Sequence, residues 1–243
     1  MFLDFSGVRS LSRTIQEKSA PIGDVSRNVN SEIKSRVQAE TGNIKTVYDP
    51  NNAFLLVNFP TVGVVYCFDT RYPLENGSYR TTTWTGMKPL CFEVTDADEL
   101  FIGVLTGIAK YNSYTDDAGS YGLQYFSHPL SFGDSSRLKF LKKVNVTTFS
   151  GENSNVTLNW AYDYRGDYRV GVYALPDFVA AQYNISEFNT TAEYSSNSSL
   201  INTQKVNTGG SGSVVQIGVT TTINGTEIAF QELNIQSTIG RIN

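Results

Sequence analysis

A succession of short apolar runs between Ala53 and Tyr114 constrains the fold of this chain more than any other feature. Each run is rich in β-branched and aromatic residues and is bounded by Pro, Gly, Asn or Asp, which is the pattern of strands joined by turns. This stretch therefore predicts consecutive β-strands with almost no helix. The runs are Phe54–Phe59, Gly63–Thr70, Ser78–Thr85, Pro89–Thr95, Glu99–Leu105 and Gly107–Tyr114.

The strand–turn–strand unit formed by Glu99–Leu105 and Gly107–Tyr111 resembles part of a β-propeller blade. A propeller needs several blades to close its ring, whereas a chain of 243 residues with other elements to accommodate has room for little more than one or two. We therefore expect a partial propeller whose strands complete a structure that another polypeptide supplies.

Residues 1–45 predict an N-terminal arm followed by one amphipathic helix. Asp24 is a good N-cap, and Gly42 is a suitable stop after the helix. Apolar residues recur every four positions between them, which predicts that one narrow stripe of the helix lies on a sheet; a helix that faces a partner is the alternative. The stripe consists of Val25, Val29, Ile33 and Val37.

Two strand patterns in the second half, Arg137–Phe149 and Asn155–Arg165, are separated by the short polar segment SGENS, which predicts a hairpin. Apolar and polar residues alternate in the second pattern, as expected of a strand with one buried and one exposed face. The predicted buried face carries Val156, Leu158, Trp160, Tyr162 and Tyr164, and the predicted exposed face carries Thr157, Asn159, Ala161 and Asp163. A third strand is expected within Asp167–Leu175.

Another hairpin is predicted for Gly212–Ile223 and Glu227–Ser237, because Asn224 and Gly225 between them tolerate the positive φ of a tight turn. The apolar residues change phase within the last strand, which predicts a β-bulge near Gln231 and Glu232. The glycine-rich segment Gly209–Gly212 is expected to be a flexible lead-in.

These patterns together predict a mainly β chain with antiparallel sheets and one N-terminal amphipathic helix. We expect an N-terminal arm and helix in residues 1–45 and a propeller-blade-like β region in residues 46–120. Residues 121–243 are expected to form an antiparallel β domain, β-sandwich-like or hairpin-rich, with a C-terminal hairpin.

Charge and hydropathy narrow the classes of partner. A formal net charge of −4 argues against a protein that binds nucleic acid through an excess of positive charge. The basic residues Arg137, Lys139, Lys142 and Lys143 nevertheless gather in one strand, where we expect a solvated face or an intersubunit salt bridge, contact with a phosphate backbone being the alternative. No run approaches the ~18 consecutive apolar residues of a membrane span, so none is expected.

The residue types that carry chemistry are sparse. His128 is the single histidine and lacks a recognisable nucleophile motif, so we expect a structural or surface role for it. Cys67 and Cys91 are expected to be two buried thiols, with a disulfide as the alternative. One histidine and two separated cysteines are too few for a zinc site.

Acidic residues occur in groups, and acidic residues in turns are ordinary. A glycosidase needs two carboxylates across a cleft, and Asp96–Glu99 has oxygen ligands for calcium without the full spaced loop. Solvated turns are the favoured interpretation, and we expect no catalytic, cofactor-binding or metal site and no enzyme activity. The groups are Asp96, Asp98 and Glu99; Asp116 and Asp117; and Asp163 and Asp167.

The segment Gly209–Ile242 is similar to the ending of bacteriophage tail proteins of the nozzle, or tail tubular B, family. Asn58–Arg71, Glu99–Tyr114 and Pro21–Val37 resemble further parts of that family in order and kind. The resemblance implies a virion protein of a short-tailed phage, made in the host cytoplasm. Copies would form a sixfold ring around a channel through which genomic DNA passes without sequence-specific binding, and would contact adaptor, nozzle or fibre proteins.

Nozzle proteins are usually several times longer, so the chain would match a C-terminal portion of one. The resemblance then implies either that the missing blades lie on another polypeptide or that this is a reduced relative with a different place in the tail. A carbohydrate-binding β-module is a second hypothesis, in which exposed aromatics such as Tyr162, Tyr164, Tyr183 and Tyr194 stack on sugars. A glycan-degrading enzyme is a third.

Overall fold

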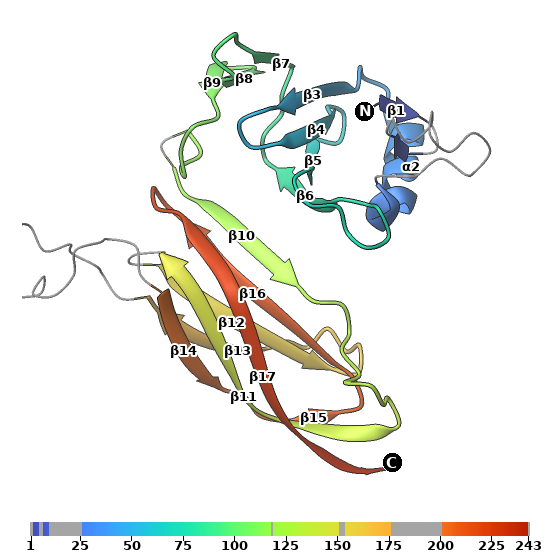
Figure 1. Cartoon of the computed structure of the whole chain (residues 1–243), viewed down its shortest axis with the longest axis vertical. Coiled ribbons are helices and arrows are strands. Elements are labelled where there is room, and N and C mark those ends of the chain that lie inside the picture. The colour runs from blue at the N-terminus through green and yellow to red at the C-terminus, as the bar shows by residue number, and fades with distance from the viewer. Residues whose placement is uncertain are drawn as a thin grey trace, which may run out of the picture. The chain divides into compact units, whose positions relative to one another are not determined.

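A computed structural model of the chain describes residues 2–4, 7–9, 26–117, 119–150, 154–175 and 201–242 (Figure 1). The chain divides into two compact units, Met1–Asn112 and Ser113–Asn243. The described residues are mainly β, with antiparallel sheets and one short α-helix, as predicted. No helix in these ranges is long and apolar enough to span a membrane.

The first unit is built on a four-stranded antiparallel sheet in which consecutive strands are neighbours. Its two middle strands are buried almost throughout, because both faces of the sheet are covered. The first of the four strands was not among the predicted ones. The strands are β3 (Lys45–Asp49), β4 (Phe54–Phe59), β5 (Val64–Asp69) and β6 (Arg80–Thr85).

Helix α2 (Asn30–Ala39) covers one face of this sheet. Ile33 is fully buried against a core that includes Phe59, and Val29 and Val37 pack on the same core, so these three residues of the predicted apolar stripe lie on a sheet. The fourth, Val25, is outside the described residues. The helix begins later than predicted. A 3-10 turn, η1 (Arg27–Val29), precedes it, and the predicted cap Asp24 is outside the described residues.

A short hairpin joins the same core. Its strands are β1 (Phe2–Asp4) and β2 (Gly7–Arg9), and Val8 of β2 is buried with Ile33. The N-terminal elements and the four-stranded sheet therefore share one core and one unit, although the sequence suggested two segments divided near residue 45.

A three-stranded meander covers part of the opposite face. It consists of β7 (Cys91–Val94), β8 (Leu100–Val104) and β9 (Gly107–Lys110), and its Leu100 and Ile102 pack on Leu56 and Val65 of the larger sheet. The first unit therefore has three layers, with the four-stranded sheet in the middle. The two sheets do not join into a ring of blades within the described ranges.

The two cysteines are unpaired, and the expectation that both are buried is wrong for Cys91. Residues alternate between half-buried and exposed along β7, and Cys91 falls in the exposed phase together with Glu93. Cys67, in the middle of β5, is buried as expected.

The second unit consists of two antiparallel sheets (Figure 1). Both sheets contribute to one hydrophobic core. In the first sheet the order is β10 (Tyr121–Phe126), β16 (Val215–Ile223), β12 (Asn155–Tyr162) and β13 (Arg169–Ala174). In the second sheet β11 (Arg137–Ser150) is central. Its partners are β17 (Ile228–Ile242), β14 (Ile201–Asn207) and β15 (Ser211–Gly212).

Both predicted hairpins of this unit are wrong. β11 pairs with β14, β15 and β17 but not with β12, and β16 pairs with β10 and β12 but not with β17. The chain therefore passes from one sheet to the other between β11 and β12 and again at Asn224–Gly225. Residues 151–153 of SGENS are outside the described residues. When two sheets share a core, a strand buries its apolar face equally well in either sheet, so the sequence pattern around these turns is the same for a hairpin and for a crossing.

The predicted bulge in the last strand is confirmed. Thr147 is opposite Glu232 and Thr148 is opposite Phe230, so Gln231 is the extra residue on β17. A further register shift leaves Lys142 as the extra residue on β11.

The segment Gly209–Gly212 is not a flexible lead-in. The carbonyl of Gly209 accepts hydrogen bonds from Trp160 Nε1 at 3.0 Å and from Tyr162 Oη at 2.9 Å. Ser211 and Gly212 form β15. Gly210 has φ +104°, and a Cβ there would lie 2.6 Å from the Tyr162 ring, so glycine is needed for the backbone to approach this ring.

The predicted alternation of buried and exposed residues in β12 is confirmed for the first half of the strand only. Asn159 and Ala161, expected to be exposed, are buried because neighbouring structure covers both faces of the strand there. Tyr164 follows the end of β12 with φ +60° and is 78 % exposed, so it does not belong to the buried face.

Candidate functional site

The open part of the four-stranded sheet in the first unit forms a pocket of about 270 Å³. The three-stranded meander leaves this part uncovered, and Tyr111, just after β9, contributes one wall. Three of the lining residues lie side by side in the strand register, where Phe54 is opposite Asp69 and Asp69 is opposite Arg80. The lining consists of Phe54, Cys67, Asp69, Arg71, Arg80, Thr82, Trp84 and Tyr111.

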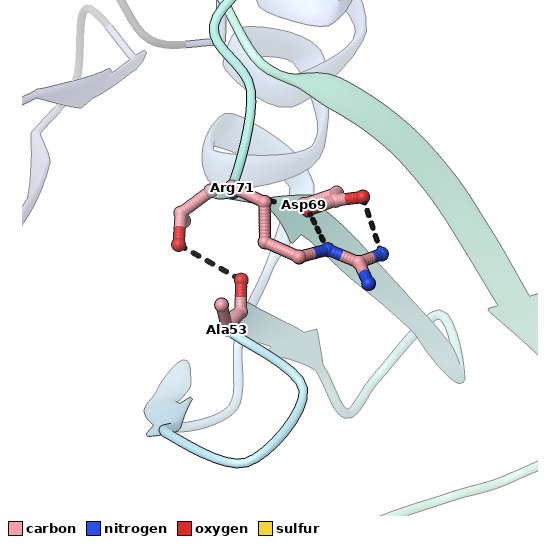
Figure 2. A network of polar contacts seen from close by, with 4 residues as sticks. Ala53, Asp69 and Arg71 are labelled. Carbon is pink, nitrogen blue, oxygen red and sulfur yellow. Dashed lines mark hydrogen bonds and ion pairs between the residues drawn. The ribbon is translucent and has the colours of Figure 1, made fainter.

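Asp69 and Arg71 form a bidentate ion pair at one end of the pocket (Figure 2). Arg71 Nε donates to Asp69 Oδ1 at 2.8 Å, and Arg71 Nη2 donates to Asp69 Oδ2 at 2.7 Å. These charge-assisted bonds hold the pKa of the Asp69 carboxyl below its ordinary value, against the opposing effect of burial. The Arg71 guanidinium also lies 5.6 Å from the centroid of the Phe54 ring, within cation–π range.

Two loops at this end of the sheet are tied together. The backbone N–H and the hydroxyl of Thr70 donate to the carbonyl of Ala53 at 2.9 and 2.8 Å. Buried Asp49 accepts hydrogen bonds from the Asn51 backbone and the Asn52 side chain, which stabilises the turn before Ala53. These bonds hold the residues before Phe54 and Arg71 in place, and with them this end of the pocket.

Arg80 differs from Arg71 in having no ion-pair partner among the described residues. It is exposed, and Asp69, its register partner, already has both oxygens bonded to Arg71. The lining thus carries two guanidinium groups and one carboxylate, an excess of one positive charge.

An aromatic wall lies beyond Arg80. Arg80, Thr82 and Trp84 occupy alternate positions of β6 and therefore share one face. The Trp84 ring stacks on the Tyr111 ring with centroids 5.4 Å apart and planes 15° apart. The pocket thus combines stacked rings, a hydroxyl, a paired carboxylate and a cation that can receive an anion.

Cys67 lies at the floor of the pocket and is not a nucleophile. Burial raises the pKa of its thiol to about 12, so it is a neutral thiol at neutral pH. Catalytic cysteines need the thiolate.

The acidic groups singled out in the sequence occupy separate turns. Asp163 accepts hydrogen bonds from the backbone N–H groups of Ser213 and Val214 at 2.8 and 3.2 Å and so stabilises the backbone. Asp98 has φ +60° in a turn, and Glu99 pairs with Lys110. Among the described residues, no group of three His, Cys, Asp or Glu side chains is placed to hold a metal ion.

The remaining sequence candidates are dispersed as well. His128 is exposed after β10, Asp116 lies in a turn with Gly119, Asp117 follows it, and Asp167 is exposed in the loop before β13.

The basic cluster of β11 is not a single solvated face. Lys139 is fully buried, and its Nζ donates to the carbonyls of Asp134 and Ser213. It shares an inward phase with Leu141 in the alternation of β11, which explains why it lies inside the unit. Arg137 pairs with Asp134 at 3.2 Å, Lys143 is half-buried, and Lys142 is exposed as expected.

The tyrosines proposed to stack on sugars do not form a site. Tyr162 is buried and donates its hydroxyl to Gly209, which leaves no free ring face for a sugar. Tyr164 is exposed in a turn, and Tyr183 and Tyr194 lie outside the described residues. Sequence reasoning missed Arg80, Trp84 and Tyr111. The period-two spacing of Arg80 and Trp84 in one strand was the available signal.

A second candidate surface is the β8–β9 hairpin. Leu105 in its turn is 90 % exposed and Ile108 in β9 is 80 % exposed. Every residue of β9 is exposed, and within the described ranges β9 pairs only with β8. One edge of the meander thus presents unpaired backbone groups beside apolar side chains.

Comparison with protein-family models finds no match to this chain, and comparison with curated proteins finds no significant match either.

Proposed function

We propose that this chain is a structural component of a bacteriophage tail that assembles in a ring around the DNA exit channel. The observation that carries the proposal is the open, apolar edge of the β7–β9 meander. The resemblance of Gly209–Ile242 and the earlier segments to nozzle proteins supplies the biological setting.

The two sheets of the first unit fit one complete and one incomplete propeller blade. β3 to β6 form a four-stranded antiparallel meander, which is the arrangement of a propeller blade. The β7–β9 meander packs on one face of this sheet and has only three strands. A fourth strand from a neighbouring copy or from another tail protein would pair with β9, cover Ile108 and complete the second blade.

The exposed edge favours an assembled state over a free monomer. Unpaired strand edges with apolar side chains are templates for association, and proteins usually protect them with charge, proline or a covering segment. In β9 the single charged side chain, Lys110, is engaged by Glu99. Pairing with a partner strand would remove this liability.

The charge of the chain suits a channel wall. A net charge of −4 disfavours tight phosphate binding, so DNA would pass without sequence-specific contacts. The sixfold copy number and the neighbours, namely adaptor, nozzle or fibre subunits, follow from the family resemblance. The chain would act in the virion as a structural protein rather than an enzyme.

The test is the mass of the full chain in solution, alone and mixed with the neighbouring tail proteins, measured by light scattering. A ring-sized species, or a monomer that enters a ring only with a tail protein, supports the proposal. A chain that stays monomeric and binds none of the tail proteins overturns the proposal.

A pair of variants locates the interface. Ile108→Lys places a charge on the β9 edge and should abolish assembly. Ile239→Lys makes the same exchange at another exposed isoleucine, in β17, and should leave the mass unchanged. Equal assembly of wild type and Ile108→Lys would contradict the role of the β9 edge.

A further inference from the structure

We infer that the pocket on the open face of β4, β5 and β6 binds an acidic monosaccharide, a six-membered sugar ring that carries a carboxylate. All its lining residues belong to the first unit of one chain. The inference therefore does not depend on ring assembly.

The size of the pocket indicates a single ring. Its volume of about 270 Å³ is just below the range of roughly 300–1,000 Å³ of sites for drug-sized ligands. A single hexose-sized ring suits this space better than a nucleotide or an extended oligosaccharide, which would project into solvent.

Arg80 is the group that selects for an anion. It is exposed at the pocket and has no ion-pair partner among the described residues, while Arg71 is already held by Asp69. Its planar guanidinium offers two parallel donors that match a carboxylate. A neutral sugar would leave this cation without a counterpart.

Asp69 retains capacity for a sugar hydroxyl. A carboxylate has about four acceptor sites. Arg71 uses three of them, through its backbone N–H, Nε and Nη2, which leaves one site on Oδ2. Thr82, next along the same face of β6, adds a hydroxyl that hydrogen-bonds the Cys67 thiol and keeps a lone pair that can accept from a sugar hydroxyl.

The stacked pair Trp84 and Tyr111 supplies the apolar wall that a sugar ring needs. One face of a pyranose carries C–H groups with partial positive charge, and aromatic faces carry partial negative charge. A small inorganic anion would use Arg80 but gain nothing from this wall. The combination of wall and cation therefore favours an acidic sugar over a neutral sugar or a bare anion.

The test is isothermal titration calorimetry of the full chain with glucuronate, glucose and acetate, and with a trisaccharide that ends in glucuronate. We expect glucuronate to bind with a stoichiometry of one and at least about tenfold more tightly than glucose or acetate. Binding of the trisaccharide alone would identify a glycan terminus as the source of the sugar, and binding of both would identify the sugar itself; either result supports the inference.

Variants assign the binding to this pocket. Arg80→Gln should weaken glucuronate binding by about tenfold or more, because the charge-assisted bonds are lost. Arg165→Gln makes the same exchange at an exposed arginine of the second unit and should not change the affinity. Tyr111→Ala, which removes half of the aromatic wall, should weaken glucuronate binding but leave any acetate binding unchanged.

A fluorescence readout accompanies these titrations. The chain has two tryptophans, Trp84 in the pocket and Trp160 in the core of the second unit. The fluorescence of a Trp160→Phe variant therefore reports on Trp84 alone. Glucuronate should change the Trp84 emission in this variant.

Several outcomes would overturn the inference. Acetate binding as tightly as glucuronate would show a plain anion site, and glucose binding as tightly would remove the role of Arg80. Absence of binding by glucuronate and by the trisaccharide, or equal affinities of wild type and Arg80→Gln, would also reject it. Ring assembly in light scattering would be unaffected by any of these results, so the two proposals fail separately.

Discussion

Lys139 Nζ donates a hydrogen bond to the backbone carbonyl of Ser213 at 2.9 Å, from a side chain that is fully buried. A second bond goes to the carbonyl of Asp134. A lysine in a run of basic residues thus connects β11 to the loop that leads into β16. It stabilises the second unit from within and does not face a channel.

Replacing Lys139 by methionine should destabilise the second unit. The carbonyls of Asp134 and Ser213 would lose their donor, which costs about 1–3 kcal/mol of unfolding free energy for a buried unsatisfied group. Urea unfolding followed by Trp160 fluorescence in a Trp84→Phe background measures this loss. Lys142→Met, at the exposed bulge of the same strand, is the control and should change stability by less than about 0.5 kcal/mol. Equal stability of the two variants would argue against the buried role of Lys139.

Gly210 should not tolerate a side chain. Its φ of +104° is unfavourable for other residues, and a Cβ would lie 2.6 Å from the Tyr162 ring and 2.7 Å from Arg169 Nη1. Gly210→Ala is therefore expected to lower the unfolding free energy by about 1–3 kcal/mol. Gly209→Ala is the matched control, since no atom lies within 4 Å of its Cβ position. Thermal unfolding compares the two variants, and equal melting temperatures would contradict the close approach.

The Asp69–Arg71 pair should make stability depend on pH in the acid range. The hydrogen bonds from Arg71 lower the pKa of Asp69 in the folded state, so its contribution is present above the ordinary carboxyl pKa of 3.8 and disappears as the pH falls through the lower folded value. The difference in unfolding free energy between wild type and Asp69→Asn should therefore shrink as the pH falls from about 6 to about 2. Denaturant unfolding at several pH values measures this difference. A difference that stays constant over the whole range would show that Asp69 contributes no pH-dependent stabilisation.

The two thiols should react differently. Cys91 is exposed, whereas Cys67 is buried and burial raises the pKa of its thiol to about 12. A thiol reagent at neutral pH is expected to modify Cys91 in the native protein and Cys67 only after unfolding, because the thiolate is the reactive form. Native Cys91→Ser should accordingly remain unmodified, as mass spectrometry would show. Rapid modification of Cys67 in this variant would contradict its burial.

Local features were predictable from the sequence. Runs of β-branched and aromatic residues bounded by turn residues located the strands from Phe54 to Lys110, and the four-residue spacing identified the apolar stripe that packs on the sheet. The phase change around Gln231 located a bulge. Each of these depends on residues close together in the chain, so backbone geometry and local hydrophobic pattern are sufficient to specify it.

Strand partners and the pocket were decided by the tertiary structure. The residues flanking SGENS and Asn224–Gly225 bury the same apolar faces whether the chain turns back within a sheet or crosses to the other, so their pattern could not specify the pairing of β11 with β17. Likewise, the run of basic residues predicts a surface position for Lys139, and only the structure shows that its side chain is buried and bonded to the carbonyl of Ser213. Asp69, Arg80 and Tyr111 form one pocket only because strand register and the packing of a second sheet bring distant segments together. The sequence alone determined the strands between Phe54 and Lys110 and the apolar stripe of the helix. Long-range packing decided which strands pair, which faces are buried and which polar groups meet, because those choices depend on the free energy of the whole core.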